Sequence, residues 1–125
     1  IGSENVSKIK VKSILKSNDG KYIFEGKGIK KDNKIIYNDN GVMTTITLGD
    51  EVYLERKKDY LLKMGFCTYN SLKGTYIIPE GNLEVKTVTK ELKQSEGELK
   101  IVYSMEINNE LIRDFELNLY YSIDS

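Results

Sequence analysis

Two arginines are the residues of this chain best suited to hold a ligand, because they alone among its 19 basic side chains carry a guanidinium group. Arg56 follows Val52 and Leu54 at every second position, so in a strand it points to the same side as these apolar residues. A buried guanidinium must be paired, and it can bind a carboxylate or phosphate through two parallel hydrogen bonds. We therefore predict that Arg56 contacts an anionic ligand inside the protein. The alternatives are that it pairs with an internal acid or reaches solvent at the end of its strand.

Arg113 is the second candidate, since it shares the alternation of Phe115 and Leu117. It lies close to a predicted hairpin turn at Asn108-Asn109, where exposure to solvent is the stronger alternative. Two arginines in one cavity would favour an anionic ligand, but the sequence leaves open whether Arg56 and Arg113 meet.

Hydroxyl groups in the inward register complete the predicted site. Tyr37, Tyr76, Tyr103 and Thr87 would each place a polar group among apolar neighbours, which is typical of a pocket for a small ligand. The alternative is that the tyrosines are ordinary core residues whose hydroxyls reach the surface or a backbone carbonyl.

Several kinds of catalytic and metal chemistry are unsupported by this composition. The chain has no histidine, which removes the commonest general base and the commonest metal ligand. Cys67 is the single cysteine, and the glutamates alternate with lysines on the outward register. We therefore predict no catalytic residues, no metal site and no cofactor, and we do not expect an enzyme.

The elements that must position these residues are strands. Apolar residues recur at every second position in most of the chain, as at Ile9, Val11 and Leu15, and turn signals separate the runs. About ten such runs follow one another at spacings of roughly 8–12 residues, which indicates a sandwich or a barrel. Hairpin-length connections favour a meander, and closure of a meander removes its exposed edges.

The predicted fold is therefore all-β: a single closed or nearly closed antiparallel meander barrel of about 8–10 strands, similar to calycins and lipocalins. We expect this domain to span residues 8–121. Residues 1–7, which begin Ile1-Gly2-Ser3, are expected to be a disordered or non-native segment outside it.

Charge and hydropathy set expectations for partners and location. The 19 basic and 19 acidic residues give a net charge of zero, which argues against a nucleic-acid partner. No apolar run approaches the roughly 18 residues of a membrane span. With one cysteine there is no intramolecular disulfide, so we expect a cytoplasmic protein. We expect it to be either a monomer or a homodimer.

Sequence motifs in the second half of the chain resemble a known family. They are Leu54-Glu55-Arg56, Met64-Gly65-Phe66, Gly74-Thr75-Tyr76-Ile77-Ile78-Pro79-Glu80-Gly81, Lys86-Thr87 and Gly97-Glu98-Leu99-Lys100-Ile101-Val102-Tyr103. The pattern resembles the YwiB-like family of small bacterial proteins, and the likeness extends over about residues 8–120. The resemblance implies a calycin-like barrel of unknown function. It does not imply lipocalin function, because a chain without tryptophan lacks the lipocalin Gly-x-Trp signature.

Two functional hypotheses remain. In the first, the barrel binds a small, partly apolar and, through Arg56, anionic ligand, with help from Tyr76, Thr87 and Tyr103. In the second, the barrel is solid and serves protein–protein interaction or self-association. That alternative requires the outward apolar residues to cluster on one face; they include Tyr53, Val88, Val102 and Tyr120.

Overall fold

The structure of the protein, a computed structural model, describes residues 6–124. These residues form ten antiparallel strands: β1 (Val6–Ser17), β2 (Gly20–Lys31), β3 (Lys34–Asp39), β4 (Val42–Thr47), β5 (Val52–Lys57), β6 (Leu61–Phe66), β7 (Leu72–Ile78), β8 (Gly81–Ser95), β9 (Glu98–Ile107) and β10 (Glu110–Ile123). None of the described residues belongs to a helix that could span a membrane.

The strands close into a barrel because the first strand pairs with the last. Each strand pairs with its neighbour in sequence, and β1 pairs with β10 from Ile9 opposite Ile123 to Lys16 opposite Glu116. The prediction of a closed antiparallel meander is confirmed. Closure gives every strand within residues 6–124 a neighbour on both sides, which is the physical advantage expected of a meander with this many strands.

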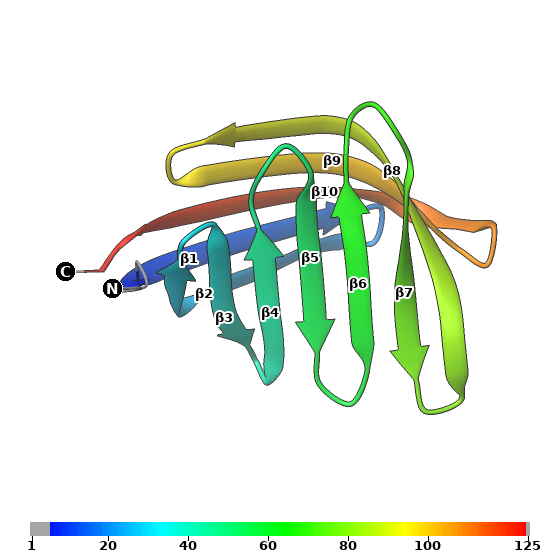
Figure 1. Ribbon diagram of the computed structural model, residues 1–125, viewed down its shortest axis with the longest axis horizontal. Helices are drawn as coiled ribbons and strands as arrows, with labels where there is room; N and C mark the ends of the chain where they lie inside the picture. Colours follow the sequence, from blue (N-terminus) through cyan, green and yellow to red (C-terminus); the bar gives the residue numbers. More distant parts are fainter. Residues whose placement is uncertain (1–5, 125) are drawn as a thin grey trace.

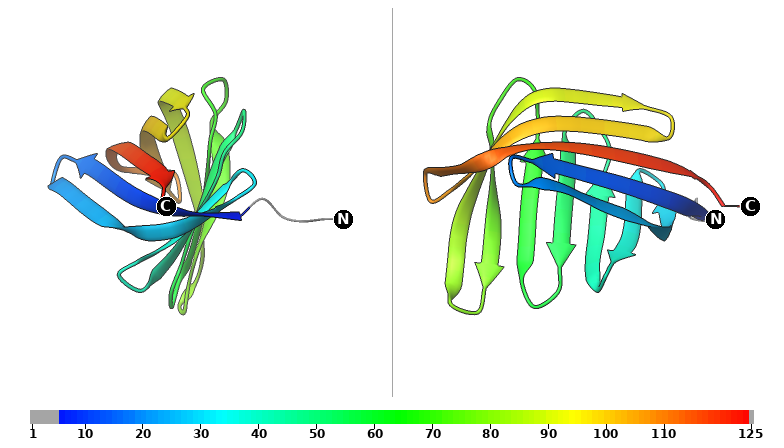
Figure 2. Two further views of the ribbon diagram at one scale, coloured as in Figure 1. Left: turned by 90° about the vertical axis from the view of Figure 1, so that its left-hand side faces the viewer. Right: turned by 180° about the vertical axis from the view of Figure 1, so that it is seen from behind.

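The barrel is flattened into two layers whose strands cross (Figure 1). Strands β3 to β7 form one layer, while β1, β2, β9 and β10 form the other, also visible from behind in Figure 2. Strand β8 belongs to both: it pairs with β7 from Gly81 to Thr87 and with β9 from Val85 onward, and it bends from one layer into the other. A register shift between Thr89 and Glu91 places a β-bulge in β8, which allows this bend.

Five turns lie toward the right and bottom of Figure 1, and we call this side of the barrel the hairpin end. They are the turns β1–β2, β3–β4, β5–β6, β7–β8 and β9–β10. The start of β1 and the end of β10 lie on the opposite side. The hairpins of the two layers point in different directions, so the layers diverge toward the hairpin end. Inner side chains there are covered less completely than those in the middle of the barrel.

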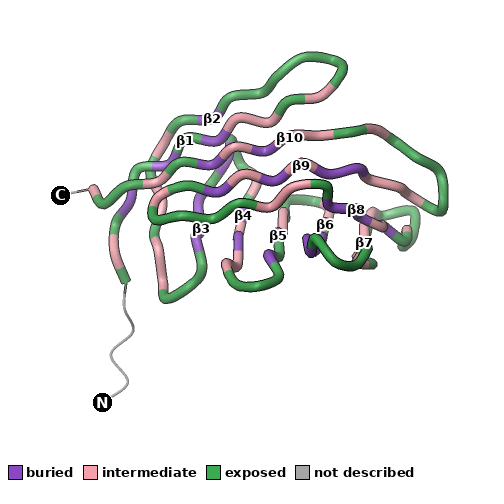
Figure 3. Tube along the Cα trace, turned by 90° about the horizontal axis from the view of Figure 1, so that it is seen from above, coloured by how far each residue is buried: buried purple, intermediate pink, exposed green. Residues whose placement is uncertain are grey.

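The core occupies the middle of the barrel. Figure 3 shows that buried stretches lie along the strands and that exposed ones concentrate at the turns. Three rings form a chain across the interior: the Tyr103 ring lies 4.7 Å from that of Phe66 and 5.3 Å from that of Phe115, between ring centres. Burial of such side chains is the main source of stability, at about 25 cal/mol per Å² of apolar surface.

One seam of the barrel is held by side chains instead of a ladder. Strands β6 and β7 pair only from Leu61 opposite Ile77 to Lys63 opposite Thr75. Beyond this point the Thr87 hydroxyl of β8 donates to the Gly65 carbonyl. The Thr89 hydroxyl accepts a 3.2 Å hydrogen bond from the Cys67 amide. Two threonines of β8 therefore bond backbone groups at the end of β6 and just after it, which the ladder does not reach.

The strand bounds differ slightly from those predicted. Strand β1 begins at Val6, so Val6 and Ser7, which the sequence placed outside the barrel, pair with Lys31 and Lys30 of β2 and belong to it. The strand β10 continues two residues beyond 121, to Ile123. The remainder of the predicted N-terminal segment lies outside the described residues.

Candidate ligand-binding site at the hairpin end

Arg56 belongs to a row of inward side chains that crosses the five strands of one layer, β3 to β7. Directly opposite pairs join Tyr37 to Thr44, Thr44 to Arg56, Arg56 to Leu62 and Leu62 to Tyr76. Because strand residues alternate between faces, the inward position of Leu54 carries Arg56 to the same face. The row therefore combines a guanidinium, two phenols, a hydroxyl and an apolar side chain.

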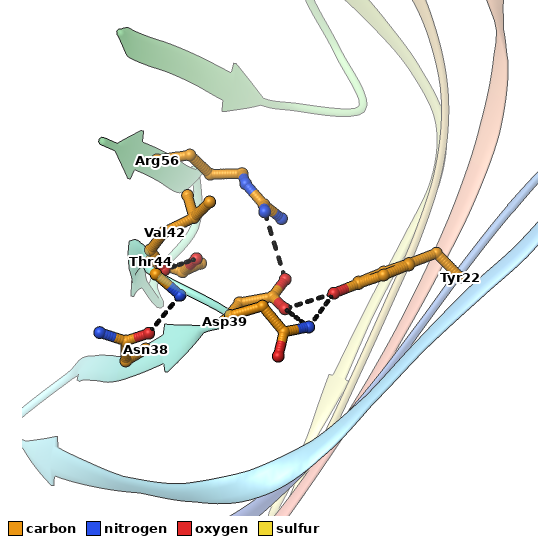
Figure 4. Close-up of polar contacts among 8 residues, drawn as sticks. Tyr22, Asn38, Asp39, Val42, Thr44 and Arg56 are labelled. Carbon is orange, nitrogen blue, oxygen red and sulfur yellow. Dashed lines mark hydrogen bonds and ion pairs between the residues drawn. The ribbon is translucent and has the colours of Figure 1, made fainter. Parts of the chain in front are cut away.

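An ion pair connects Arg56 to Asp39, the last residue of β3. The guanidinium lies 3.2 Å from the Asp39 carboxylate, and the exposed fractions of the two side chains are 26% and 3%. Tyr22 of β2 donates a 2.7 Å hydrogen bond to the same carboxylate, and Asn40 donates to the Tyr22 hydroxyl over 2.6 Å. Figure 4 shows Tyr22 reaching Asp39 from the opposite layer, so this group of residues links the two layers at the hairpin end.

The guanidinium of Arg56 retains unused hydrogen-bonding capacity. It carries five N–H donors, and its one contact within residues 6–124 is the bond from Nη2 to Asp39. The pairing is therefore single rather than the two-bond arrangement that arginine and carboxylate can adopt. The donors that remain are free to contact water or a ligand.

Two buried phenols lie within electrostatic reach of this guanidinium. Burial raises the pKa of Tyr37 and of Tyr103, because an apolar environment disfavours the phenolate. The positive charge of Arg56 opposes the rise in both pKa values. For Tyr37 a hydrogen bond with Ser13 opposes it as well.

The Tyr103 hydroxyl has no hydrogen-bond partner among the described residues. Every fully buried side-chain nitrogen or oxygen of the described residues does have a partner. The Tyr103 hydroxyl therefore touches solvent, although its residue is only 4% exposed.

The hydrogen bond to Asp39 keeps the Tyr22 hydroxyl in its protonated, donating form. Its pKa is raised chiefly by the hydrogen bond to Asp39, since a carboxylate acceptor favours the protonated phenol. Asp39 thus receives donors from three side chains, Arg56, Tyr22 and, at 3.4 Å, Asn40. A carboxylate that is 3% exposed requires such partners.

The structure brings together four of the six predicted site residues. Tyr37, Arg56 and Tyr76 share the inner row, and Tyr103 faces it from the other layer. Tyr76 is half-buried and meets the ring of Tyr60 edge-on at 5.9 Å.

Two predicted site residues do not join this group. The Thr87 hydroxyl donates a hydrogen bond to the Gly65 carbonyl. A contact with a backbone carbonyl is the alternative that the sequence leaves open for the tyrosines, and here a threonine makes such a contact. Arg113 pairs with Asp19 of the β1–β2 turn, and these side chains are 38% and 70% exposed. The two arginines therefore pair with separate carboxylates, each on a different hairpin.

Sequence reasoning missed Tyr22 and Asp39. Tyr22 shares the alternation of Phe24, which is buried in the core, so the same register could have identified it. Asp39 continues the inward series of Ile35 and Tyr37, but the turn residues that follow it concealed this register. For Arg56, pairing with an internal acid is one of the alternatives that the sequence leaves open, and the structure shows this pairing, with Asp39.

Other functional features are sparse in the described part of the chain. Residues 6–124 contain no group of three or more His, Cys, Asp or Glu side chains able to hold a metal ion. Cys67 is buried and unpaired. The outward apolar residues proposed for protein contacts are divided, since Tyr53 lies on β5 whereas Val88, Val102 and Tyr120 lie on β8, β9 and β10.

Comparison with known proteins identifies a family and a fold. The model of a family described as a domain of unknown function, DUF1934, matches residues 7–119. No curated protein matches the chain. The crystal structure of the ywiB protein from Bacillus subtilis superposes with a TM-score of 0.64 at 20% identity, over 98% of this chain and 94% of that one. At this identity the likeness establishes a shared fold and nothing about shared activity.

Proposed function

The chain belongs to the DUF1934 family, as its resemblance to YwiB-like proteins predicted, and we propose that it binds a small, partly apolar anion at the hairpin end of the barrel. The observation that carries this proposal is the Arg56 guanidinium, which lies inside the barrel with one N–H engaged among residues 6–124. Its remaining donors are the groups that would hold the anion.

The electrostatics favour an anionic group of modest charge. Asp39 neutralises one positive charge, but its carboxylate is shared among Arg56, Tyr22 and Asn40. A guanidinium can bind carboxylates along more than one edge, because its donors form a planar fork. A ligand carboxylate on the free edge of Arg56 would also lie near the Tyr103 hydroxyl, which is free to donate.

The surroundings of Arg56 favour a ligand with an apolar part. Leu62 lies directly opposite Arg56, and Tyr76 lies opposite Leu62. Leu15 and Phe115 of the other layer are likewise only partly buried where they pack against the core. The ligand must be small, because the rings of Phe66 and Tyr103 already occupy the middle of the barrel.

Calorimetric titration with sodium octanoate tests the proposal, with 1-octanol as the uncharged counterpart. We expect octanoate to bind and octanol to bind at least tenfold more weakly, since hydrogen bonds to charged groups contribute about 1.5–3 kcal/mol. Arg56→Leu should reduce octanoate affinity at least tenfold for the same reason. Circular dichroism and urea unfolding of each variant would establish that it remains folded.

Two further variants make the result specific. Arg56→Leu leaves Asp39 without its cation, so the pair Arg56→Leu/Asp39→Asn provides a version with no unpaired charge. Arg113→Leu is the matched control at the same end of the barrel, and we expect its octanoate affinity to stay within twofold of the unmodified protein. Absence of octanoate binding, or equal losses in Arg56→Leu and Arg113→Leu, would reject the proposal.

A further inference from the structure

A groove of about 360 Å³ lies on the outer face of the layer formed by β3 to β7, away from the hairpin-end site. Its lining includes three lysines, three threonines and an aromatic ring, from Lys34, Thr45, Thr47, Tyr53, Lys63, Lys73 and Thr75. Along β5 the side chains alternate, so Tyr53 and Glu55 face this groove while Leu54 and Arg56 face the interior. The groove and the hairpin-end site therefore lie on opposite faces of the same strands.

The groove lies where the sheet opens between β6 and β7, and the Tyr53 ring covers Gly65 beside it. Gly65 stands directly opposite Tyr53, and β6 separates from β7 beyond Lys63. A side-chain carbon on Gly65 would come within 2.9 Å of the Tyr53 ring, so the ring lies over this glycine. An aromatic side chain that covers a glycine stabilises a sheet, which accounts for Tyr53 without any ligand. It does not account for the charges around the groove.

The lysines of this groove lack the carboxylate partners that several lysines have on the other layer. The ammonium groups of Lys34, Lys63 and Lys73 form no ion pair or hydrogen bond within residues 6–124, although Glu55 lies opposite Lys63 in the neighbouring strand. On the outer face of the other layer six lysines lie within 3.5 Å of carboxylates: Lys12, Lys16, Lys27, Lys90, Lys93 and Lys100. Lys8 and Lys10 of β1 form no ion pair within residues 6–124. Three lysines and one glutamate give the groove lining a net charge of +2 (3 − 1).

The neutral groups of the groove add further donors. The hydroxyls of Thr45, Thr47 and Thr75 form no hydrogen bond with other described residues. An ammonium group can only donate, and a hydroxyl can donate to any acceptor within reach. Unpaired ammonium and hydroxyl groups thus converge on one concave surface, which suits a ligand with several negatively charged acceptor oxygens.

We propose that this outer groove binds a small phosphate-bearing molecule. Lys63 and Lys73 flank the surface over Gly65 and hold the phosphate, while the exposed Tyr53 ring supports the organic part of the ligand. A groove of about 360 Å³ lies at the lower end of the range of small-molecule sites. This site is independent of the ligand proposed for the hairpin end.

Two probes test the groove: inorganic pyrophosphate for the phosphate site, and adenosine monophosphate for the contact with Tyr53. Titration at low salt, followed by backbone amide chemical shifts, should show changes concentrated at β4 to β7. The double variant Lys63→Met/Lys73→Met keeps the aliphatic stems and removes the charges, and we expect it to weaken pyrophosphate binding at least tenfold. Tyr53→Leu should weaken the binding of the monophosphate about threefold or more and leave pyrophosphate unaffected.

A matched pair of lysines on the other layer supplies the control. In Lys90→Met/Lys100→Met two charges are likewise lost, but from lysines that are paired with carboxylates. Its pyrophosphate affinity should remain within twofold of the unmodified protein. Absent binding, shift changes spread over both layers, or equal losses in the two double variants would overturn the proposal. Octanoate affinity should be unchanged in Lys63→Met/Lys73→Met, so failure here is distinguishable from failure at the hairpin end.

Discussion

The middle of the barrel and its hairpin end are built from the same inward register, yet they contain different chemistry. In the middle, rings and aliphatic side chains contact one another, as Phe66, Tyr103 and Phe115 do. At the hairpin end, the same register carries Arg56, Asp39 and Tyr22, joined by an ion pair and hydrogen bonds.

This difference indicates a division of roles between the two regions. Apolar burial in the middle stabilises the barrel with little dependence on polar partners. At the hairpin end a carboxylate that is 3% exposed is acceptable only because several donors surround it. Polar groups that contribute little net stability are the ones that a binding site would need.

The largest expected effect comes from the middle. Phe66 is completely buried, so Phe66→Ala should lower the free energy of unfolding by about 3–5 kcal/mol through lost contacts and a cavity. Urea unfolding measures this change, and Phe66→Leu should lose much less. We expect the folded variant to keep its octanoate affinity within twofold. A stability loss below about 1 kcal/mol would contradict the division of roles.

An intermediate effect should appear at Tyr103, between the two regions, when the pH is raised. Its pKa is raised by burial, so the folded protein keeps the phenol protonated at pH values where the unfolded chain, with a pKa of about 10, releases the proton. The stability contributed by this group is complete below about pH 10 and is lost as the pH rises further, by up to about 1.4 kcal/mol per pH unit.

Tyr103→Phe removes this dependence and should change little at neutral pH, because the hydroxyl has no partner among the described residues. Urea unfolding of both proteins at pH 9 and pH 11 isolates the effect, since the other tyrosines and the lysines titrate in both. An equal difference in stability at the two pH values would show that the Tyr103 phenol titrates normally.

The smallest expected effect lies at the hairpin end. Tyr22→Phe removes the 2.7 Å hydrogen bond to Asp39, while Arg56 and Asn40 remain as donors, so the loss should be about 1 kcal/mol. Tyr120→Phe is the control, because the Tyr120 hydroxyl bonds no other described residue. If Tyr22→Phe were as damaging as Phe66→Ala, the hairpin end would be a second core instead of a binding region.

Much of this architecture was predictable, because a strand carries its burial pattern in alternate residues. The alternation of Ile9, Val11 and Leu15 identified strands, and the short turns between runs indicated a meander. The same rule correctly predicted that Arg56 points inward. It could not identify the partner of Arg56, because the ion pair joins strands β3 and β5, which are not neighbours in the sheet.

The sequence by itself therefore determined the all-β secondary structure, the inward face of most strand residues and the absence of histidine chemistry. Only the tertiary structure decided which inward groups meet. Tyr22 contacts Asp39 because the strands of the two layers cross. The Thr87 hydroxyl reaches the Gly65 carbonyl because β6 and β7 separate there. Arg113 pairs with Asp19 because their hairpins lie side by side. The physical reason is that alternation is a local property of each strand, whereas contacts across a barrel depend on the register, bend and crossing of all the strands together.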